Sequence, residues 1–316
     1  MSAQEVAQVG GGEPVIRARR LSVWYGAVIG LNDVSLDLGQ GVIGLLGPNG
    51  AGKSTFMKCV TGQIKARTGD VTILGEKVWN NANVFGEIGL VPEQDAFYEQ
   101  MTGLEFVTYL TRLQGFSKKD SKALAQEALE RVDLGEKMNA PIKSYSKGMR
   151  QRTKIAQALA HKPRVLFMDE PLAGTDPMGR RKIIKLIQEL GDAGGTIVVS
   201  SHVLHEVEQM TRSIVLINRG RVLADGDVHK IRGMIDGHPH TITLMCEQPR
   251  RFAQALVGFE DVSKVSFVPN GLMVSTTDPD ACYTRLPALA LEHGFTLHRM
   301  SSPDDNLEAV FNYLVT

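Results

Sequence analysis

Apolar and polar positions along the chain predict short buried strands separated by amphipathic helices. The first hundred residues carry strand patterns, at 15–22, 31–38, 42–46, 69–75 and 88–91. Residues 102–114 and 118–132 repeat apolar positions at helical spacing, and a glycine follows each run. Further on, helices expected from 147 and at 177–190 and 203–210 alternate with strands at 165–168, 197–200 and 214–217. This alternation predicts an α/β fold with a mostly parallel sheet covered by helices.

The pattern changes near residue 236, where Asp-Gly-His-Pro predicts a domain boundary. We therefore expect a flexible tail at 1–13, a large domain at 14–235 and a small α+β domain at 236–316. In the small domain, Pro269-Asn270-Gly271 between two strand patterns indicates a hairpin. Leu307, Val310, Phe311 and Leu314 place one apolar stripe on an expected terminal helix.

Composition limits the possible partners. The 316 residues contain 35 basic and 35 acidic side chains, so no overall charge favours nucleic acid. No run of apolar residues is long enough to span a bilayer, and we therefore expect no direct membrane insertion. Three scattered cysteines fit a reducing cytoplasm and predict neither a disulfide framework nor a zinc site.

The strongest chemical signal is a glycine-rich loop between an apolar strand and a helix. Residues 47–55 read Gly-Pro-Asn-Gly-Ala-Gly-Lys-Ser-Thr, the G-x-x-x-x-G-K-[ST] pattern that wraps backbone N–H groups around a polyphosphate. The predicted phosphate-binding residues are Asn49, Gly50, Ala51, Gly52, Lys53, Ser54 and Thr55. Lys53 can reach the terminal phosphates, and the Ser54 hydroxyl can ligate Mg²⁺.

A second group of residues lies at strand ends and helix starts. The strand 165–168 leads into Asp169, which can hold Mg²⁺ through its water shell, and Glu170, which can deprotonate an attacking water. His202 follows the next strand; it is either a packing residue or a group that reaches the terminal phosphate. Tyr25 is either a core aromatic or a flat surface for a base. Ser146 is placed to cap the helix that follows it.

Together these residues resemble the nucleotide-binding subunits of ATP-binding cassette (ABC) transporters, over about residues 14–235. The resemblance implies a P-loop ATPase of the ABC type, with a mixed sheet core and a helical subdomain at about 95–160. It implies that Tyr25 stacks on adenine, that Asp176 belongs to the D-loop, and that Ser146 and Gly148 belong to the signature motif. It also implies that Glu170 is the catalytic base, that Lys53 and His202 assist catalysis, and that the cofactors are ATP and Mg²⁺.

Two departures from the family pattern are informative. Pro92 is followed by Glu93 and then Gln94, so either residue can take the catalytic, Mg²⁺-approaching role of the Q-loop glutamine. The signature reads Tyr-Ser-Lys-Gly-Met at 145–149 in place of Leu-Ser-Gly-Gly-Gln. These variants resemble the two-component exporter branch associated with drug resistance, natural-product export or gliding.

The resemblance also implies partners and a place in the cell. Two copies, or this chain with a paralogue, would close head to tail around two ATP molecules at the cytoplasmic face of the membrane. A permease would dock between Glu93 and Leu113, where Phe97, Tyr98 and Met101 are candidate contacts. The alternatives are an ABC importer ATPase and a soluble ABC ATPase that acts on ribosomes or DNA. The single cassette and the lack of a basic stripe weigh against the second alternative.

Overall fold

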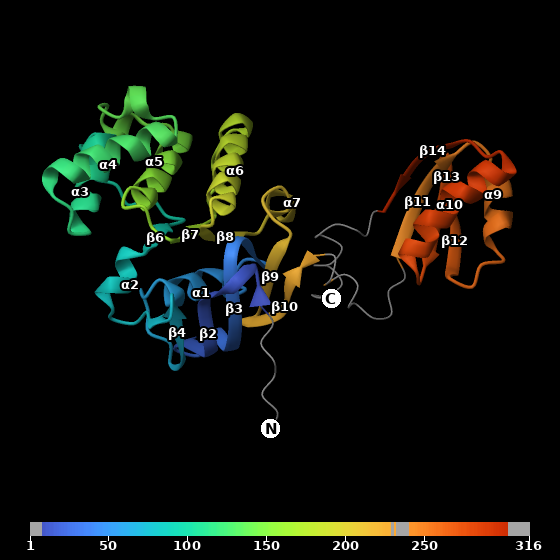
Figure 1. Cartoon of the computed structure of the whole chain (residues 1–316), viewed down its shortest axis with the longest axis horizontal. Helices are drawn as coiled ribbons and strands as arrows, with labels where there is room; N and C mark the ends of the chain where they lie inside the picture. Colours follow the sequence, from blue (N-terminus) through green and yellow to red (C-terminus); the bar gives the residue numbers. More distant parts are fainter. Residues whose placement is uncertain (1–7, 229–230, 232–239, 303–316) are drawn as a thin grey trace. The chain divides into compact units, whose positions relative to one another are not determined.

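The computed structural model describes residues 8–228, 231 and 240–302 (Figure 1). The chain divides into two compact units, Met1–Asp227 and Val228–Thr316. The expected boundary at 236–239 and the expected helix over 307–314 lie outside the described residues. Among those that are described, no helix is both long enough and apolar enough to cross a membrane.

A ten-stranded mixed sheet forms the first unit, which confirms the predicted α/β class. Seven strands follow one another across it: β5 (Glu76–Lys77), β4 (Thr68–Ile73), β2 (Gly11–Tyr25), β3 (Val28–Leu46), β8 (Thr196–Ser201), β7 (Val165–Asp169) and β6 (Ile88–Val91). Three more pair beside this path: β1 (Gln8–Val9), β9 (Ser213–Asn218) and β10 (Arg221–Asp227). The strands from β3 to β6 are parallel, whereas β2, β4 and β5 pair antiparallel.

The sheet corrects two expectations about the N-terminal region. Residues 31–38 and 42–46 form one continuous strand, β3, because its partner changes along its length. It pairs antiparallel with β2 up to Gln40 and parallel with β8 from Gly41, so its backbone groups keep partners throughout. Residues 8–13, expected within a flexible tail, belong to β1 and β2. Val9 is buried, and it pairs with Leu38.

Helices cover the sheet and form a separate cluster in the same unit (Figure 1). The cluster consists of α3 (Gly103–Leu113), α4 (Lys118–Arg131) and α5 (Lys147–Leu159), which share one buried core. The remaining helices are α1 (Lys53–Val60), α2 (Ala82–Gly86), α6 (Pro177–Asp192) and α7 (Leu204–Glu208). Short 3-10 turns occur at Gly135–Lys137 and Ile142–Ser144. A capping box, in which Thr102 and Glu105 bond to each other's backbone N–H, begins α3.

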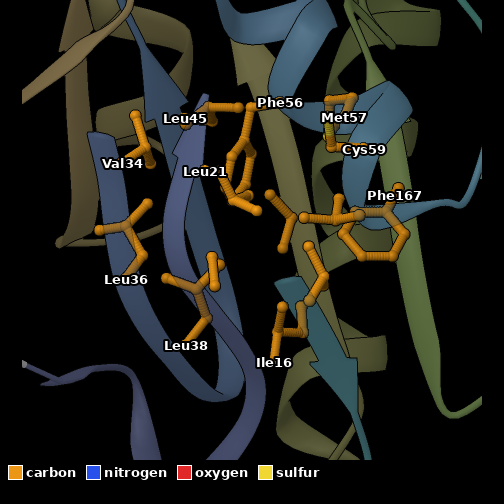
Figure 2. Close-up of a cluster of buried hydrophobic side chains, with 14 of the residues drawn as sticks. Ile16, Leu21, Val34, Leu36, Leu38, Leu45, Phe56, Met57, Cys59 and Phe167 are labelled. Carbon is orange, nitrogen blue, oxygen red and sulfur yellow. The ribbon is translucent and has the colours of Figure 1, made fainter. Parts of the chain in front are cut away.

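Burial against the sheet fixes the helix that follows the glycine loop. Phe56, Met57 and Cys59 of α1 pack among Leu21, Leu45 and Phe167 (Figure 2). The Phe56 side chain is fully buried, which contributes about 1.5–3 kcal/mol relative to exposure. The glycine loop is therefore held between a buried strand and a buried helix.

Residues 240–302 of the second unit form a four-stranded antiparallel sheet with two helices. The strand order is β12 (Val262–Val268), β13 (Gly271–Thr276), β11 (His240–Cys246) and β14 (Leu297–Ser301). The helices are α9 (Pro249–Leu256) and α10 (Pro279–His293). The predicted hairpin is confirmed: Val268 pairs with Gly271 around a tight turn in which Asn270 has φ 60°.

Candidate nucleotide site

A cavity of about 420 Å³ lies at the end of β3, a volume within the usual range for small-ligand sites. Three parts of the first unit line it: the end of β2 with the start of β3, the glycine loop, and the loops after β6, β7 and β8. The lining residues are Tyr25, Val28, Ile29, Gly30, Asn49, Gly50, Ala51, Gly52, Lys53, Ser54, Thr55, Glu93, Glu170, Ala173 and His202.

The glycine loop turns sharply into α1, whose first residue is Lys53. Gly52 has φ +112°, and a Cβ there would lie 2.6 Å from the carbonyl oxygen of Gly30, so only glycine suits this position. The first turn of α1 directs free backbone N–H groups and the positive end of the helix dipole to the loop, which favours an anion. The Lys53 ammonium donates to the carbonyl oxygens of Gly47 (2.7 Å) and Pro48 (3.3 Å).

Asp169 and Glu170 both bond to one buried serine at the ends of β7 and β8, although only Glu170 lines the cavity itself. Ser200, fully buried, donates its hydroxyl hydrogen bond to Asp169 Oδ1. The same hydroxyl accepts the backbone N–H of Glu170 at 3.1 Å. Glu170 has φ +49°, a conformation that costs energy for a residue with a side chain and recurs at functional sites. Its Oε1 lies 2.9 Å from His202 Nδ1. The short segment 200–202 therefore contacts both acidic residues, through Ser200 and His202.

Burial sets the ionisation of the charged groups in the cavity. It raises the pKa of Glu170 above its ordinary value, against the opposing effects of His202 and Lys53. It lowers the pKa of Lys53, and the carboxylates of Glu170, Asp169 and Glu93 partly offset this change. Glu170 therefore binds a proton more strongly than an exposed glutamate does, which suits a general base.

Tyr25 lines the cavity from the end of β2. Its side chain is 48% exposed, so it is not a core aromatic, and the ring is close to Gly30, where a Cβ would meet it at 2.9 Å. An exposed aromatic ring beside a glycine offers a flat apolar surface for a base.

The structure separates the two candidates that follow Pro92. Glu93 lines the cavity, and its charge acts on Lys53. Both residues are exposed, but Gln94 does not line the cavity. The prediction left both residues open for the same role, and this arrangement brings only Glu93 to the cavity.

Three more predicted site residues lie outside this cavity, on exposed or half-buried surface. Ser146 is the N-cap of α5, as predicted, and accepts the N–H of Met149 at 3.3 Å. Gly148 lies in the first turn of that helix, and Asp176 is the N-cap of α6. Both helix starts therefore present backbone N–H groups at the surface rather than to the chain's own cavity.

Sequence reasoning missed several residues that build the site. Ser200 bonds to the Asp169 carboxylate, and Lys154 bonds to the Glu93 carbonyl oxygen; both are tertiary contacts. Val28, Ile29, Gly30 and Ala173 also line the cavity. The pairing of Asp169 with Ser200 across β7 and β8 was the available signal for Ser200, because adjacent parallel strands bring their ends together.

Comparison with known proteins agrees with this geometry. The family model for the ABC transporter matches residues 31–173. The linearmycin resistance ATP-binding protein LnrL of Bacillus subtilis (strain 168) is 30% identical over 301 residues, covering 94% of this chain and 97% of LnrL. The daunorubicin/doxorubicin resistance ATP-binding protein DrrA of Streptomyces peucetius is 29% identical, covering 91% of this chain and 88% of DrrA.

A solved structure shares the fold of the first unit. It is described as "Dimeric Structure of MJ0796, a Bacterial ABC Transporter Cassette", and it is 25% identical with a TM-score of 0.62, covering 67% of this chain and 98% of that one. The phosphate loop, the paired carboxylates and these relatives lead to one conclusion: the chain belongs to the ATP-binding proteins of the ABC transporter family, and it is an ATPase that binds ATP.

Proposed function

We propose that this chain powers a membrane exporter, through a nucleotide-sandwich dimer that ATP closes and hydrolysis reopens. The observation that carries the proposal is the extent of the match to LnrL. It covers 94% of the chain and so continues beyond the ABC cassette into the second unit. LnrL and DrrA are both resistance ATP-binding proteins, which favours export over import. The proposed place of action is the cytoplasmic face of the membrane, where the chain would be held by a permease.

The cavity supports a division of labour for hydrolysis. Tyr25 would stack on adenine, while the glycine loop and Lys53 would hold the phosphates. Glu170 would accept the proton of the attacking water, because its raised pKa favours proton uptake and His202 fixes the orientation of its carboxylate. His202 would also contact the terminal phosphate and keep the water in line with it.

Mg²⁺ fits the donor set of this site. In nucleotide sites the ion takes one or two protein oxygen ligands, and water and phosphate oxygens complete its shell. The Ser54 hydroxyl and the Asp169 carboxylate would hold it, with Glu93 rather than Gln94 nearby. The bound ion would neutralise charge on the phosphates.

The second half of each site would come from another copy. Ser146 and Gly148 lie at an exposed helix start outside the chain's own cavity, where they can face the phosphates of a second chain. The similar cassette MJ0796 is a dimer, which supports this arrangement. We propose a homodimer.

A Glu170→Gln variant tests the sandwich. It should bind ATP, lose at least about 100-fold in turnover, and accumulate as a dimer with ATP and Mg²⁺, because the base is removed and the phosphate contacts remain. Light scattering after size-exclusion chromatography measures the dimer, with ADP as the control. A Lys53→Ala variant should lose ATP binding and stay monomeric. If the Glu170→Gln protein remains monomeric with ATP and Mg²⁺, the homodimer is wrong.

The structure changes the expected permease contacts. Phe97 and Met101 are half-buried and pack on the core of the helical cluster, so they are poor candidates. Tyr98 is 60% exposed and lies edge-on to Tyr109, with their ring centroids 6.1 Å apart. Leu113, one turn further along α3, is 68% exposed. We propose that Tyr98, Tyr109 and Leu113 form the permease-docking surface.

Affinity capture from detergent-solubilised membranes tests this assignment. The wild-type chain should retain a protein with several spanning helices, and Tyr98→Glu should lose it. Trp79→Glu is the matched control, because Trp79 is a similarly exposed aromatic elsewhere on the unit. If only ribosomes or soluble proteins are captured, the exporter proposal fails and the ribosome- or DNA-directed alternative leads.

A further inference from the structure

One face of α5 bonds to successive points along the segment that runs from β6 through Glu93 to Glu99. His161, just beyond α5, bonds to the Ile88 carbonyl at 2.9 Å, and Gln157 donates to the Leu90 carbonyl at 2.7 Å. Two further side chains bond to the segment nearer the start of the helix. Lys154 donates to the Glu93 carbonyl oxygen (2.9 Å) and pairs with Asp95 Oδ1 (3.0 Å). Arg150 donates to both carboxylate oxygens of Glu99 (2.6 and 2.8 Å).

The spacing of these four side chains explains their common face. Positions 150, 154, 157 and 161 are four, three and four residues apart, which places them on one stripe of a helix. Their partners occur in the reverse order along the chain, so helix and segment run antiparallel. Gly89 allows the close approach, because a Cβ there would collide with the Ala158 carbonyl oxygen. We call these four side chains and their partners the α5 ladder.

Lys154 is the member of the α5 ladder that bonds to Glu93, a residue that lines the nucleotide cavity. Its side chain is only 5% exposed, and a lysine is buried at a large cost unless partners stabilise its charge. Here the Glu93 carbonyl and the Asp95 carboxylate are those partners. The Glu93 backbone is thereby fixed, while the Glu93 side chain lines the nucleotide cavity and acts on Lys53.

The same helix begins at Ser146, two turns before Lys154. The ladder therefore joins the exposed helix start to the segment that enters the cavity. We propose that Lys154 is a positioning residue for ATP hydrolysis, which holds Glu93 at the nucleotide and ties its placement to that of α5. The proposal rests on the proposed role of Glu93 in the site and not on the exporter assignment.

Turnover and ATP affinity, measured separately, test the proposal on the purified full chain. Lys154→Met should lower kcat about tenfold while the Kd for a fluorescent ATP analogue changes less than about threefold, because the glycine loop is untouched. Lys154→Arg keeps the charge and should restore kcat to within about threefold of wild type. Lys185→Met is the control, because Lys185 is 77% exposed and pairs only at 3.7 Å with Glu189.

The decisive comparison uses a Glu93→Ala background. If Lys154 acts through Glu93, the double variant Glu93→Ala/Lys154→Met should have the kcat of Glu93→Ala within about twofold. A folded Lys154→Met protein with wild-type kcat overturns the proposal. So does a Lys154→Met loss that multiplies in full onto the Glu93→Ala loss, because that result indicates a general structural defect. Wild-type turnover of Glu93→Ala alone overturns it as well.

Two further variants keep the test decisive. If Lys154→Met fails to fold, Asp95→Asn takes its place. This variant removes the charge of the carboxylate that pairs with Lys154, at a side chain that is 43% exposed. It should give the same non-additive result with Glu93→Ala. Glu170→Gln reports separately on the site: if it hydrolyses ATP at the wild-type rate, the site assignment fails. An inactive Glu170→Gln beside a fully active Lys154→Met overturns only the role of Lys154.

Discussion

Removal of the Ser200 hydroxyl should affect both the stability and the turnover of this ATPase. Ser200 is fully buried, and its hydroxyl joins the Asp169 carboxylate to the backbone N–H of Glu170. In Ser200→Ala, Asp169 loses a bond worth about 1.5–3 kcal/mol, the usual range for a hydrogen bond to a charged group. The Glu170 N–H keeps only the Ser200 carbonyl, at 3.3 Å.

The loss translates into measurable quantities. A destabilisation of about 2 kcal/mol lowers Tm by about 4–8 °C, since domains of 150–250 residues shift by about 2–4 °C per kcal/mol. Because the Asp169 carboxylate and the Glu170 backbone lose the group that aligns them, kcat should fall about 10- to 100-fold with little change in ATP affinity. Differential scanning calorimetry and steady-state ATP hydrolysis measure the two effects.

The neighbouring serine supplies the matched control. Ser201 is also buried on β8, but its hydroxyl accepts only the nearby Val203 N–H, at 3.0 Å. Ser201→Ala should therefore cost about 0.5–1.5 kcal/mol and leave kcat within about twofold of wild type. The reasoning is refuted if Ser200→Ala behaves as Ser201→Ala does, or if its kcat equals that of the wild type.

Four further predictions concern the site and the contacts that support it. As pH is lowered, turnover should begin to fall at a higher pH than an ordinary glutamate would give, because burial raises the pKa of Glu170 and the base must be ionised. A pH–kcat profile measures this, and an acid limb at or below the ordinary glutamate range contradicts it. By the same shift, the Glu170 contribution to folding stability is present below its ordinary pKa and is lost as pH rises through the raised value, which urea unfolding of wild type and Glu170→Gln at several pH values can show. Glu93→Ala should lower kcat at least about tenfold and Gln94→Ala less than about twofold, because only Glu93 lines the cavity; the reverse order in the ATPase assay would assign the role to Gln94. Gly89→Ala should destabilise by about 1–3 kcal/mol through overpacking against the Ala158 carbonyl oxygen and the side chains of Leu166 and Pro163. Gly86→Ala is the control, because a Cβ there meets no atom within 4 Å, and equal urea midpoints for the two variants would contradict the prediction.

The sequence was most informative where chemistry depends on neighbours in the chain. The glycine loop, Lys53 and Ser54 form one local motif, and an apolar run identifies Asp169 and Glu170 at a strand end. Local signals also predicted the Ser146 cap and the hairpin at Asn270, because both depend on short-range backbone geometry.

Residues that act through tertiary contacts could not be predicted in this way. Lys154 has the sequence signature of an ordinary helix surface residue, and only the packing of α5 on the Glu93 segment buries it. Ser200 depends on the register of β7 and β8. The apolar pattern predicted two strands, at 31–38 and 42–46, whereas the structure has one, β3, because its pairing partners change between them.

The change of partners along β3 has a consequence for synthesis of the chain. Its first half pairs with β2, a neighbour in sequence, but its second half pairs with β8, where Gly41 meets Thr196. The ribosome needs about 8–30 s to add the intervening 155 residues at about 5–20 residues per second. During that interval the segment 41–46 lacks β8 and β9, the strands with which it pairs, and its edge stays open. We therefore expect the nascent chain to depend on chaperones until β8 has emerged, and chains truncated before β8 to aggregate.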